Sequence, residues 1–329
     1  MTAFVTGSSL ALDFGFAYLV GRAFIRSAND LRLLFLYALP GLAIVALVLA
    51  FESISHNIFL RPFLADVLGK PEPVIYSRIR WGLVRAVGPF PHPILGGVFL
   101  ATMLPLAIFL TNNWRQCAIA VLVTLSSLFV VSSTALLALI LAAALTGAYA
   151  VQRLTRVPVF LVIAFYLSLL YVAIGALSES GPLSFFIRYF TLDEGSGYYR
   201  TLIWQFAGAE AAANPFFGIG LRDWARPGWM GDSVDSYWLV LSMRYGIPSA
   251  LASAVVMAGT IGLLASTGKH RSSRDQHVAV ALAILLFTVM FSGLSVHIWE
   301  GLHIWVIMLC GASVTFAKEY RSAVAGDRA

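Results

Sequence analysis

The stretch LLFLYALPGLAIVALVLAF, from Leu33 to Phe51, contains no charged residue over 19 positions. A helix needs about 20 apolar residues to cross the hydrocarbon core of a bilayer, so this run has the length of one span. Its continuous hydrophobicity lacks the period of two that marks a strand of a membrane β-barrel. Because every backbone polar group must be bonded internally in lipid, we expect the run to form a helix.

Comparable apolar runs recur along the chain of 329 residues, which is 59% hydrophobic and only 12% charged. With a mean hydropathy of +0.83, the chain has too few polar residues to cover a water-soluble globule. The sequence therefore predicts an all-α polytopic membrane protein, a single integral membrane domain over 1–329 with about nine transmembrane helices. The expected spans are Phe4–Leu19, Leu33–Phe51, Ile94–Leu110, Cys117–Val131, Ala135–Ala150, Val157–Leu177, Ser249–Leu264, Val278–Leu294 and Ile304–Phe316.

Basic residues fall into two groups by position. If the spans alternate, one group lies in short connections on one side, while the short connections on the other side, 132–134 and 297–303, have no lysine or arginine. The positive-inside rule places the first group in the cytoplasm. We therefore interpret the net charge of +6 as topological and expect no nucleic-acid partner. The first group is Arg22, Arg26, Arg32, Arg115, Arg153, Arg156, Lys269, Arg271, Arg274, Lys318, Arg321 and Arg328.

The same alternation puts two long connections, Glu52–Pro93 and Ser178–Asp235, outside the cytoplasm, together with the N-terminus. In the second loop, Tyr199, Leu202, Ile203 and Phe206 recur at helical spacing, which predicts a helix that Asn214-Pro215 ends. A second short helix is expected over Ser236–Tyr245, separated from the next span by Gly246 and Pro248.

Arginines of the outer loops stand beside Gly/Pro turns or at the ends of expected spans. The planar guanidinium bonds phosphate through parallel N–H groups, so we expect at least two of them to hold a phosphate. Some can instead brace the loop through Asp223, Asp232 or Glu210. His92, at the mouth of a span, is a further candidate. Trp204 is another, although tryptophans near an interface are typical of an aromatic belt. The arginines are Arg85, Arg200, Arg222, Arg226 and Arg244.

At these residues the chain resembles the O-antigen ligase and O-antigen polymerase superfamily of bacterial envelope glycan assembly. The resemblance covers about Arg32 to Phe316 and rests on three segments in order. The first is RAVGPFPHP from Arg85. The second is Arg200 through Trp204 followed by NPFFGIG from Asn214 to Gly220. The third is Asp235-Ser236 with Gly246 ten residues after the serine. Asp235 stands where the ligases keep a histidine, which makes the chain more similar to members that polymerise exopolysaccharide.

The resemblance implies an inverting, metal-independent glycosyl transfer on the outer leaflet of the bacterial inner membrane, with no cofactor. The implied donor is a polyprenyl-pyrophosphate-linked oligosaccharide, and the implied acceptor is a sugar hydroxyl. The other implied partners are membrane lipid and other polysaccharide assembly and export proteins. Arg85 and Arg200 would stabilise the pyrophosphate leaving group, and Asp235 would act as the base. Arg222, Arg226, Arg244, His92 and Trp204 would contact the substrate. The sequence does not separate polymerase from ligase.

Asp235 has a second interpretation of equal weight. An aspartate directly before Ser-Tyr-Trp-Leu is a good N-cap, worth about 0.5–2 kcal/mol to the short helix. Asparagine caps almost as well but cannot accept a proton, so Asp235→Asn separates a cap from a base.

A secondary transporter or flippase for an anionic lipid-linked substrate is the alternative function. Transporters place ionisable groups near the membrane midplane, and the expected spans carry almost none apart from Asp13.

The two cysteines, Cys117 and Cys310, form no CxxC motif, which indicates neither a metal site nor a disulfide framework. The segment Met1–Leu19 lacks a basic n-region, unlike a signal peptide. Because more spans are usual in the family that the chain resembles, we expect the natural protein, or its relatives, to carry further helices upstream.

Overall fold

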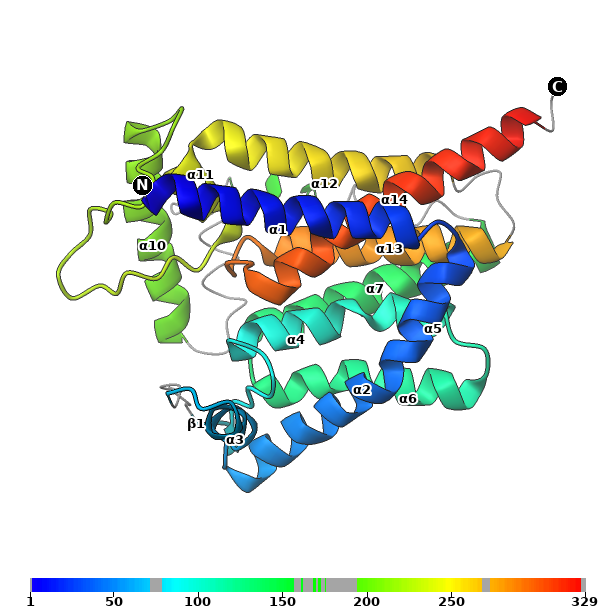
Figure 1. Ribbon diagram of the computed structural model, residues 1–329, viewed down its shortest axis with the longest axis horizontal. Helices are drawn as coiled ribbons and strands as arrows, with labels where there is room; N and C mark the ends of the chain where they lie inside the picture. The colour runs from blue at the N-terminus through cyan, green and yellow to red at the C-terminus, as the bar shows by residue number, and fades with distance from the viewer. Residues whose placement is uncertain are drawn as a thin grey trace. The chain divides into compact units, whose positions relative to one another are not determined.

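The computed structural model describes residues 2–71, 79–156, 194–267 and 273–326, with positions 161, 168, 169, 171, 172 and 175. Nearly all of its regular structure is helical (Figure 1). The elements are α1 (Thr2–Phe24), α2 (Ala28–Ser55), α3 (Leu60–Val67), β1 (Ile79–Arg80), β2 (Leu83–Val84), α4 (Pro93–Thr102), α5 (Leu104–Phe109), α6 (Trp114–Leu125), η1 (Ser126–Val130), α7 (Ser133–Thr155), α10 (Glu194–Ala213), α11 (Tyr237–Tyr245), α12 (Ile247–Thr267), α13 (Ser273–Ser292) and α14 (Glu300–Gly326).

Five helices in the described ranges are long and apolar enough to cross a membrane. They lie in α2 (Ala28–Ser55), α7 (Ser133–Thr155), α12 (Ile247–Ser266), α13 (Asp275–Ser292) and α14 (Glu300–Lys318). The chain is thus a multi-pass helical membrane protein, as the sequence predicts. The part of the chain that the structure describes thus contains five such helices, not the layout of about nine spans that the sequence predicts.

Two expected spans are interrupted helices. The run Ile94–Leu110 divides at Met103 into α4 and α5, and Pro105 in the first turn of α5 has no N–H to continue the helical bonding. The run Cys117–Val131 is α-helical only to Leu125 and ends as the 3-10 helix η1. Hydropathy windows register composition and miss such breaks, because the breaks depend on local backbone bonding.

Two further expected spans are not among these five helices, one because of its composition and one because it lies outside the described residues. The run Phe4–Leu19 lies within α1, which is helical but is not among the helices of sufficient hydropathy. Asp13 and several Gly, Ser and Thr residues dilute its apolar character. The run Val157–Leu177 falls almost wholly outside the described residues.

The expected loop Glu52–Pro93 contains regular structure. It includes the last turn of α2, the short helix α3 and a two-stranded hairpin in which Ile79 pairs with Val84 and Arg80 with Leu83. In the expected loop Ser178–Asp235, residues 178–193 lie outside the described part. The predicted helix is confirmed as α10, which ends at Ala213, directly before Asn214-Pro215. The second predicted helix is confirmed as α11.

Contacts between residues divide the chain into two compact units. Unit 1 comprises Met1–Ala142, Ala254–Ser292 and Ile298–Ala329, and unit 2 comprises Ala143–Ser253 and Gly293–His297. The expected single membrane domain over 1–329 stays a prediction.

Close helix packing in unit 1 depends on two glycines. Helix α1 runs beside α14 (Figure 1). A Cβ on Gly21 would lie 1.9 Å from the Met308 carbonyl oxygen, and one on Gly311 would lie 2.2 Å from the Tyr18 carbonyl oxygen. Small residues let helix backbones approach in this way where packing, rather than hydrophobic burial, must hold helices together.

Unit 2 has an apolar core of its own. Ile203, Ala207 and Ala211 of α10 are buried with Leu239 and Met243 of α11. Their spacing along α10, four residues apart, puts these side chains on one face of the helix. The loop between the two helices adds Ile219, Trp224, Met230 and Val234 to the same core. The loop that carries Arg222, Arg226 and Asp235 is therefore anchored by buried apolar side chains.

Candidate functional site

Two motif segments of unit 2 bond to each other through their backbones. The Ile219 N–H donates to the Met243 carbonyl at 2.8 Å, and the Gly220 N–H donates to the Arg244 carbonyl at 2.9 Å. The Ile247 N–H donates to the Pro215 carbonyl at 2.7 Å. The NPFFGIG segment is thus fastened along the end of α11 and forms one turn with it. We call residues 215–220 and 243–247 the paired turn.

Glycine is required at two positions of the paired turn. Gly246 has φ +90°, and a Cβ there would lie 2.1 Å from the Phe216 carbonyl oxygen. Gly218 has φ +65°, and its Cβ would lie 2.5 Å from the Arg244 carbonyl carbon. Both the left-handed backbone and the close approach exclude a side chain. The glycines of the sequence motif therefore have a packing reason.

Two candidate arginines brace the paired turn. The Arg244 Nη1 donates to the carbonyls of Gly220 at 3.1 Å and Arg222 at 3.2 Å. The Arg222 Nε donates to the Ile219 carbonyl at 3.2 Å. Arg222 is exposed and Arg244 is half-buried. Their positive charges are thus fixed at the turn, where an anion could be held.

Arg226 has several partners within its own loop. Its Nη1 forms a salt bridge with Asp223 and donates to the Trp224 carbonyl at 3.2 Å, while its Nε donates to the Met230 carbonyl at 3.1 Å. The guanidinium also lies over the Trp224 ring, 5.2 Å from its centre. The hydrogen bond with Arg226 lowers the pKa of Asp223. These contacts match the loop-bracing role that the sequence left open through Asp223.

Arg200 and Trp204 lie one turn apart on α10. Arg200 is only 7% exposed, and Trp204 is half-buried against the unit 2 core. The neighbouring Tyr199 hydroxyl accepts a hydrogen bond from the Gly231 N–H at 2.8 Å, which ties α10 to the loop. Glu210 adds a second tie, because its Oε2 accepts from the Ala225 N–H at 3.2 Å. The helix carrying Arg200 is therefore held firmly against the loop.

Asp235 does not cap α11. Ser236 is the N-cap, and its hydroxyl oxygen accepts a hydrogen bond from the Leu239 N–H at 3.4 Å. The interpretation of Asp235 as a cap is therefore wrong, because the helix begins one residue later than a cap at position 235 requires. The half-buried Asp235 carboxylate instead accepts from the Ser233 hydroxyl at 3.2 Å.

Arg85 and His92 belong to unit 1. Arg85 follows β2, and its Nε lies 3.5 Å from the Val130 carbonyl oxygen at the end of η1. His92 is the N-cap of α4, with Nδ1 accepting from the Ile94 N–H at 3.2 Å. The His92 ring also lies 5.9 Å from that of Trp299. Through this hydrogen bond, His92 holds the loop that precedes it against the start of α4.

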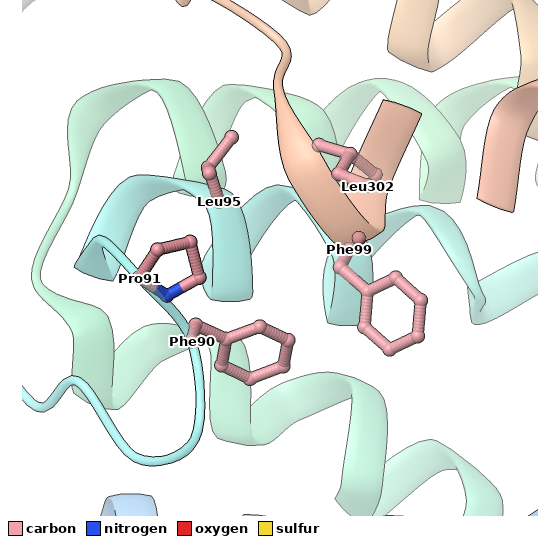
Figure 2. Close-up of a pocket in the computed structure, with 6 residues that line it drawn as sticks. Phe90, Pro91, Leu95, Phe99 and Leu302 are labelled. Atoms are coloured by element: carbon pink, nitrogen blue, oxygen red, sulfur yellow. The ribbon is translucent and has the colours of Figure 1, made fainter. Parts of the chain in front are cut away.

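An apolar cavity of about 180 Å³ lies beside this loop in unit 1. Figure 2 shows the rings of Phe90 and Phe99 and the side chain of Leu302 on its walls. The Arg61 guanidinium donates to the Pro91 carbonyl at 3.0 Å and so fastens α3 to the cavity wall. Such a lining suits an apolar group. The cavity is lined by Phe90, Pro91, Leu95, Phe99, Gly301 and Leu302.

The sequence reasoning missed Glu52, which holds the Arg85 loop in place. This carboxylate is fully buried at the end of α2. Its Oε2 accepts from the N–H groups of Val87 at 3.0 Å and Gly88 at 2.8 Å. Its Oε1 accepts from the Leu60 N–H at 3.3 Å, at the start of α3. The signal in the sequence was a lone carboxylate directly after the uncharged run Leu33–Phe51.

We expect Glu52→Gln to lower the free energy of unfolding by about 1–3 kcal/mol, because an amide nitrogen cannot accept the bonds that one carboxylate oxygen now accepts. Thermal unfolding of the detergent-purified protein measures the change. Asp66→Asn, at an exposed position of α3, is the control and should leave the midpoint unchanged. Equal midpoints for Glu52→Gln and the wild type would contradict the anchoring role.

His297 is the second missed residue. It lies in the short connection between α13 and α14, which the sequence reasoning treated only as a topological marker. In the structure Gly293–His297 of this connection belong to unit 2, and the His297 ring lies nearly parallel to that of Tyr237 of α11 with ring centres 6.4 Å apart. A histidine in a connection expected on the same side as the candidate loops was the available signal.

Unit 2 gathers six of the eight predicted site residues, namely Arg200, Trp204, Arg222, Arg226, Asp235 and Arg244. Arg85 and His92 are in unit 1, so a clamp formed jointly by Arg85 and Arg200 stays a prediction. Among the described residues, no group of three or more His, Cys, Asp or Glu side chains could hold a metal ion.

The chain matches no model of a known protein family and no curated protein.

Proposed function

We propose that this membrane protein transfers a glycan on the outer leaflet of a bacterial inner membrane, as in O-antigen or exopolysaccharide polymerisation or ligation. The donor is a polyprenyl-pyrophosphate-linked glycan and the acceptor is a sugar hydroxyl. The observation that carries the proposal is the paired turn: two motif segments, distant in sequence, bond into one structure that fixes Arg222 and Arg244. Arg200 and Asp235 lie in the same unit.

The reaction needs two kinds of group from the protein, one that stabilises the leaving group and one that accepts a proton. The acceptor oxygen attacks the anomeric carbon, the bond from that carbon to the pyrophosphate oxygen breaks, and the pyrophosphate leaves with the electron pair. Fixed guanidinium groups stabilise the charge that develops on the leaving group. The acceptor proton passes to a base, and Asp235 is the base that the sequence predicts.

The proposal requires the candidate loops to face outward. We expect an alkaline phosphatase reporter to be active when it is joined at Lys70 or at Gly228, and inactive when it is joined within Lys269–Asp275. The reason is that basic short connections stay in the cytoplasm, whereas phosphatase folds only outside it. Reporter activity in intact cells, normalised to fusion-protein level, is the measurement. The reverse pattern would contradict an outer-leaflet reaction.

The direct test gives the purified protein a polyprenyl-pyrophosphate oligosaccharide and an acceptor glycan. A lengthened or transferred glycan, seen by mass spectrometry, supports the proposal. The same donor placed in one leaflet of liposomes tests the alternative. Movement of an unchanged donor to the other leaflet, with no new glycosidic bond, would favour a flippase or transporter instead.

A further inference from the structure

The connection between α13 and α14 is bonded to the start of α11. The Tyr237 N–H is shared between the carbonyls of Gly293 at 2.9 Å and Val296 at 3.0 Å. The Ser236 hydroxyl donates to the Gly293 carbonyl at 3.2 Å. These bonds fix the backbone of residues 293–297 against the first turn of α11, so the position of His297 is determined by the residues that follow Asp235.

The His297 ring is held from one side by Tyr237. The two rings are nearly parallel, with an interplanar angle of 20°. Tyr237 is buried, whereas His297 keeps part of its surface exposed. The imidazole therefore faces a buried ring on one side, while the residue as a whole keeps part of its surface exposed.

Two charged groups have opposite effects on the pKa of His297. Burial lowers the His297 pKa most strongly, the Asp235 carboxylate raises it and Arg244 lowers it, and the result is a pKa of about 4. At neutral pH the ring is thus uncharged and has a lone pair that can accept a proton. Asp235 comes from the loop, and Arg244 and Tyr237 come from α11, so a carboxylate, a cation and an aromatic ring of unit 2 all act on one imidazole.

We propose that His297 is the base that takes the proton of the acceptor hydroxyl, and that Asp235 is a positioning residue that acts through His297. The inference rests on the proposed glycosyl transfer and names its proton acceptor. As the acceptor oxygen forms its bond to the anomeric carbon, its proton passes to an imidazole nitrogen, and the pyrophosphate leaves with the electrons of the broken bond. The Asp235 carboxylate stabilises the imidazolium that results.

Donor binding makes His297 a stronger base. An anionic pyrophosphate held at Arg222 and Arg244 offsets the positive charge that now lowers the His297 pKa. The pKa of His297 therefore rises when the donor is bound and moves towards the range in which general bases work best. The proton is then taken mainly in the complex that is ready to react.

The first test compares two substitutions by rate. We expect His297→Gln to lower turnover about 100-fold, with donor binding unchanged within about twofold. We expect Asp235→Asn to lower turnover about tenfold and to move the acidic limb of the pH-rate profile to lower pH. The sign follows because loss of the carboxylate lowers the His297 pKa, and a base works above its pKa. His303→Gln is the control, since that ring lies against Phe14 in unit 1, with ring centres 4.2 Å apart, and its rate should equal the wild-type rate.

The second test does not depend on catalysis. Nitrogen-15 labelling of the histidines lets NMR follow His297 as the pH is changed. We expect Asp235→Asn to lower its titration midpoint and Arg244→Gln to raise it. A bound polyprenyl pyrophosphate should also raise it. An unchanged midpoint in Asp235→Asn would overturn the pairing of these two residues.

The outcomes separate this inference from the proposed function. If wild-type protein transfers glycan and His297→Gln does so at the same rate, the inference alone is wrong. If Asp235→Asn abolishes transfer while His297→Gln retains it, Asp235 is the direct base. If the wild type transfers no glycan from any polyprenyl-pyrophosphate donor, the proposed function fails and the role of His297 as its base fails with it.

Discussion

Replacing Arg200 with lysine is expected to lower the turnover number about 100-fold while the protein still folds. Arg200 is 7% exposed on α10, so water competes weakly for its guanidinium, and the interaction with a leaving pyrophosphate is correspondingly strong. Lysine keeps the positive charge but offers a compact ammonium in place of a planar fork, and it cannot bond two phosphate oxygens in parallel.

The kinetic parameters distinguish a transition-state role from simple binding. A group that acts mainly on developing charge lowers kcat and kcat/KM together, whereas a group that only binds the donor raises KM. Arg115→Lys is the matched control, because Arg115 is on α6 and lies over the Trp114 ring. Arg85→Lys tests the second arginine that the sequence predicts to bind phosphate. A normal rate for both Arg200→Lys and Arg85→Lys would contradict phosphate binding at these positions.

Replacing Gly246 with alanine should lower the free energy of unfolding by about 3 kcal/mol or more. The methyl group would meet the Phe216 carbonyl oxygen at 2.1 Å, and backbone, unlike a flexible side chain, cannot move aside cheaply. Either α11 or the NPFFGIG segment must shift. The bonds of the paired turn would then break, and Arg244 would lose its fixed position.

Two other glycines of unit 2 make a graded series. Gly220 has φ +64° but open space around it, so Gly220→Ala should cost only the left-handed backbone, about 1–2 kcal/mol. Gly228 has open space and an ordinary φ, so Gly228→Ala should have no measurable effect. Thermal unfolding in detergent and limited proteolysis of the loop give the order. Equal stability of the Gly246 and Gly228 variants would contradict the close approach.

The sequence predicted the class of protein and its local helices well. Uncharged runs such as Leu33–Phe51 require helices in lipid, whatever their neighbours are. The helix around Ile203 is also visible from side-chain spacing, with Asn214-Pro215 marking its end, and the helix over Ser236–Tyr245 was predicted from the Gly246 and Pro248 that follow it. Glycines at 218 and 246 were recognised as motif positions. Their reason is steric and emerges only when the two segments are placed together.

What the tertiary structure alone decided depends on contacts between residues far apart in the chain. Glu52 meets the N–H groups of Val87 and Gly88, and Tyr237 meets Gly293, across stretches that no periodicity connects. The assignment of the cap to Ser236 rather than to Asp235 follows from where the first turn of α11 begins. Local patterns record which side chains face lipid or form a helix, whereas a hydrogen bond to a distant backbone leaves no periodic trace in the sequence.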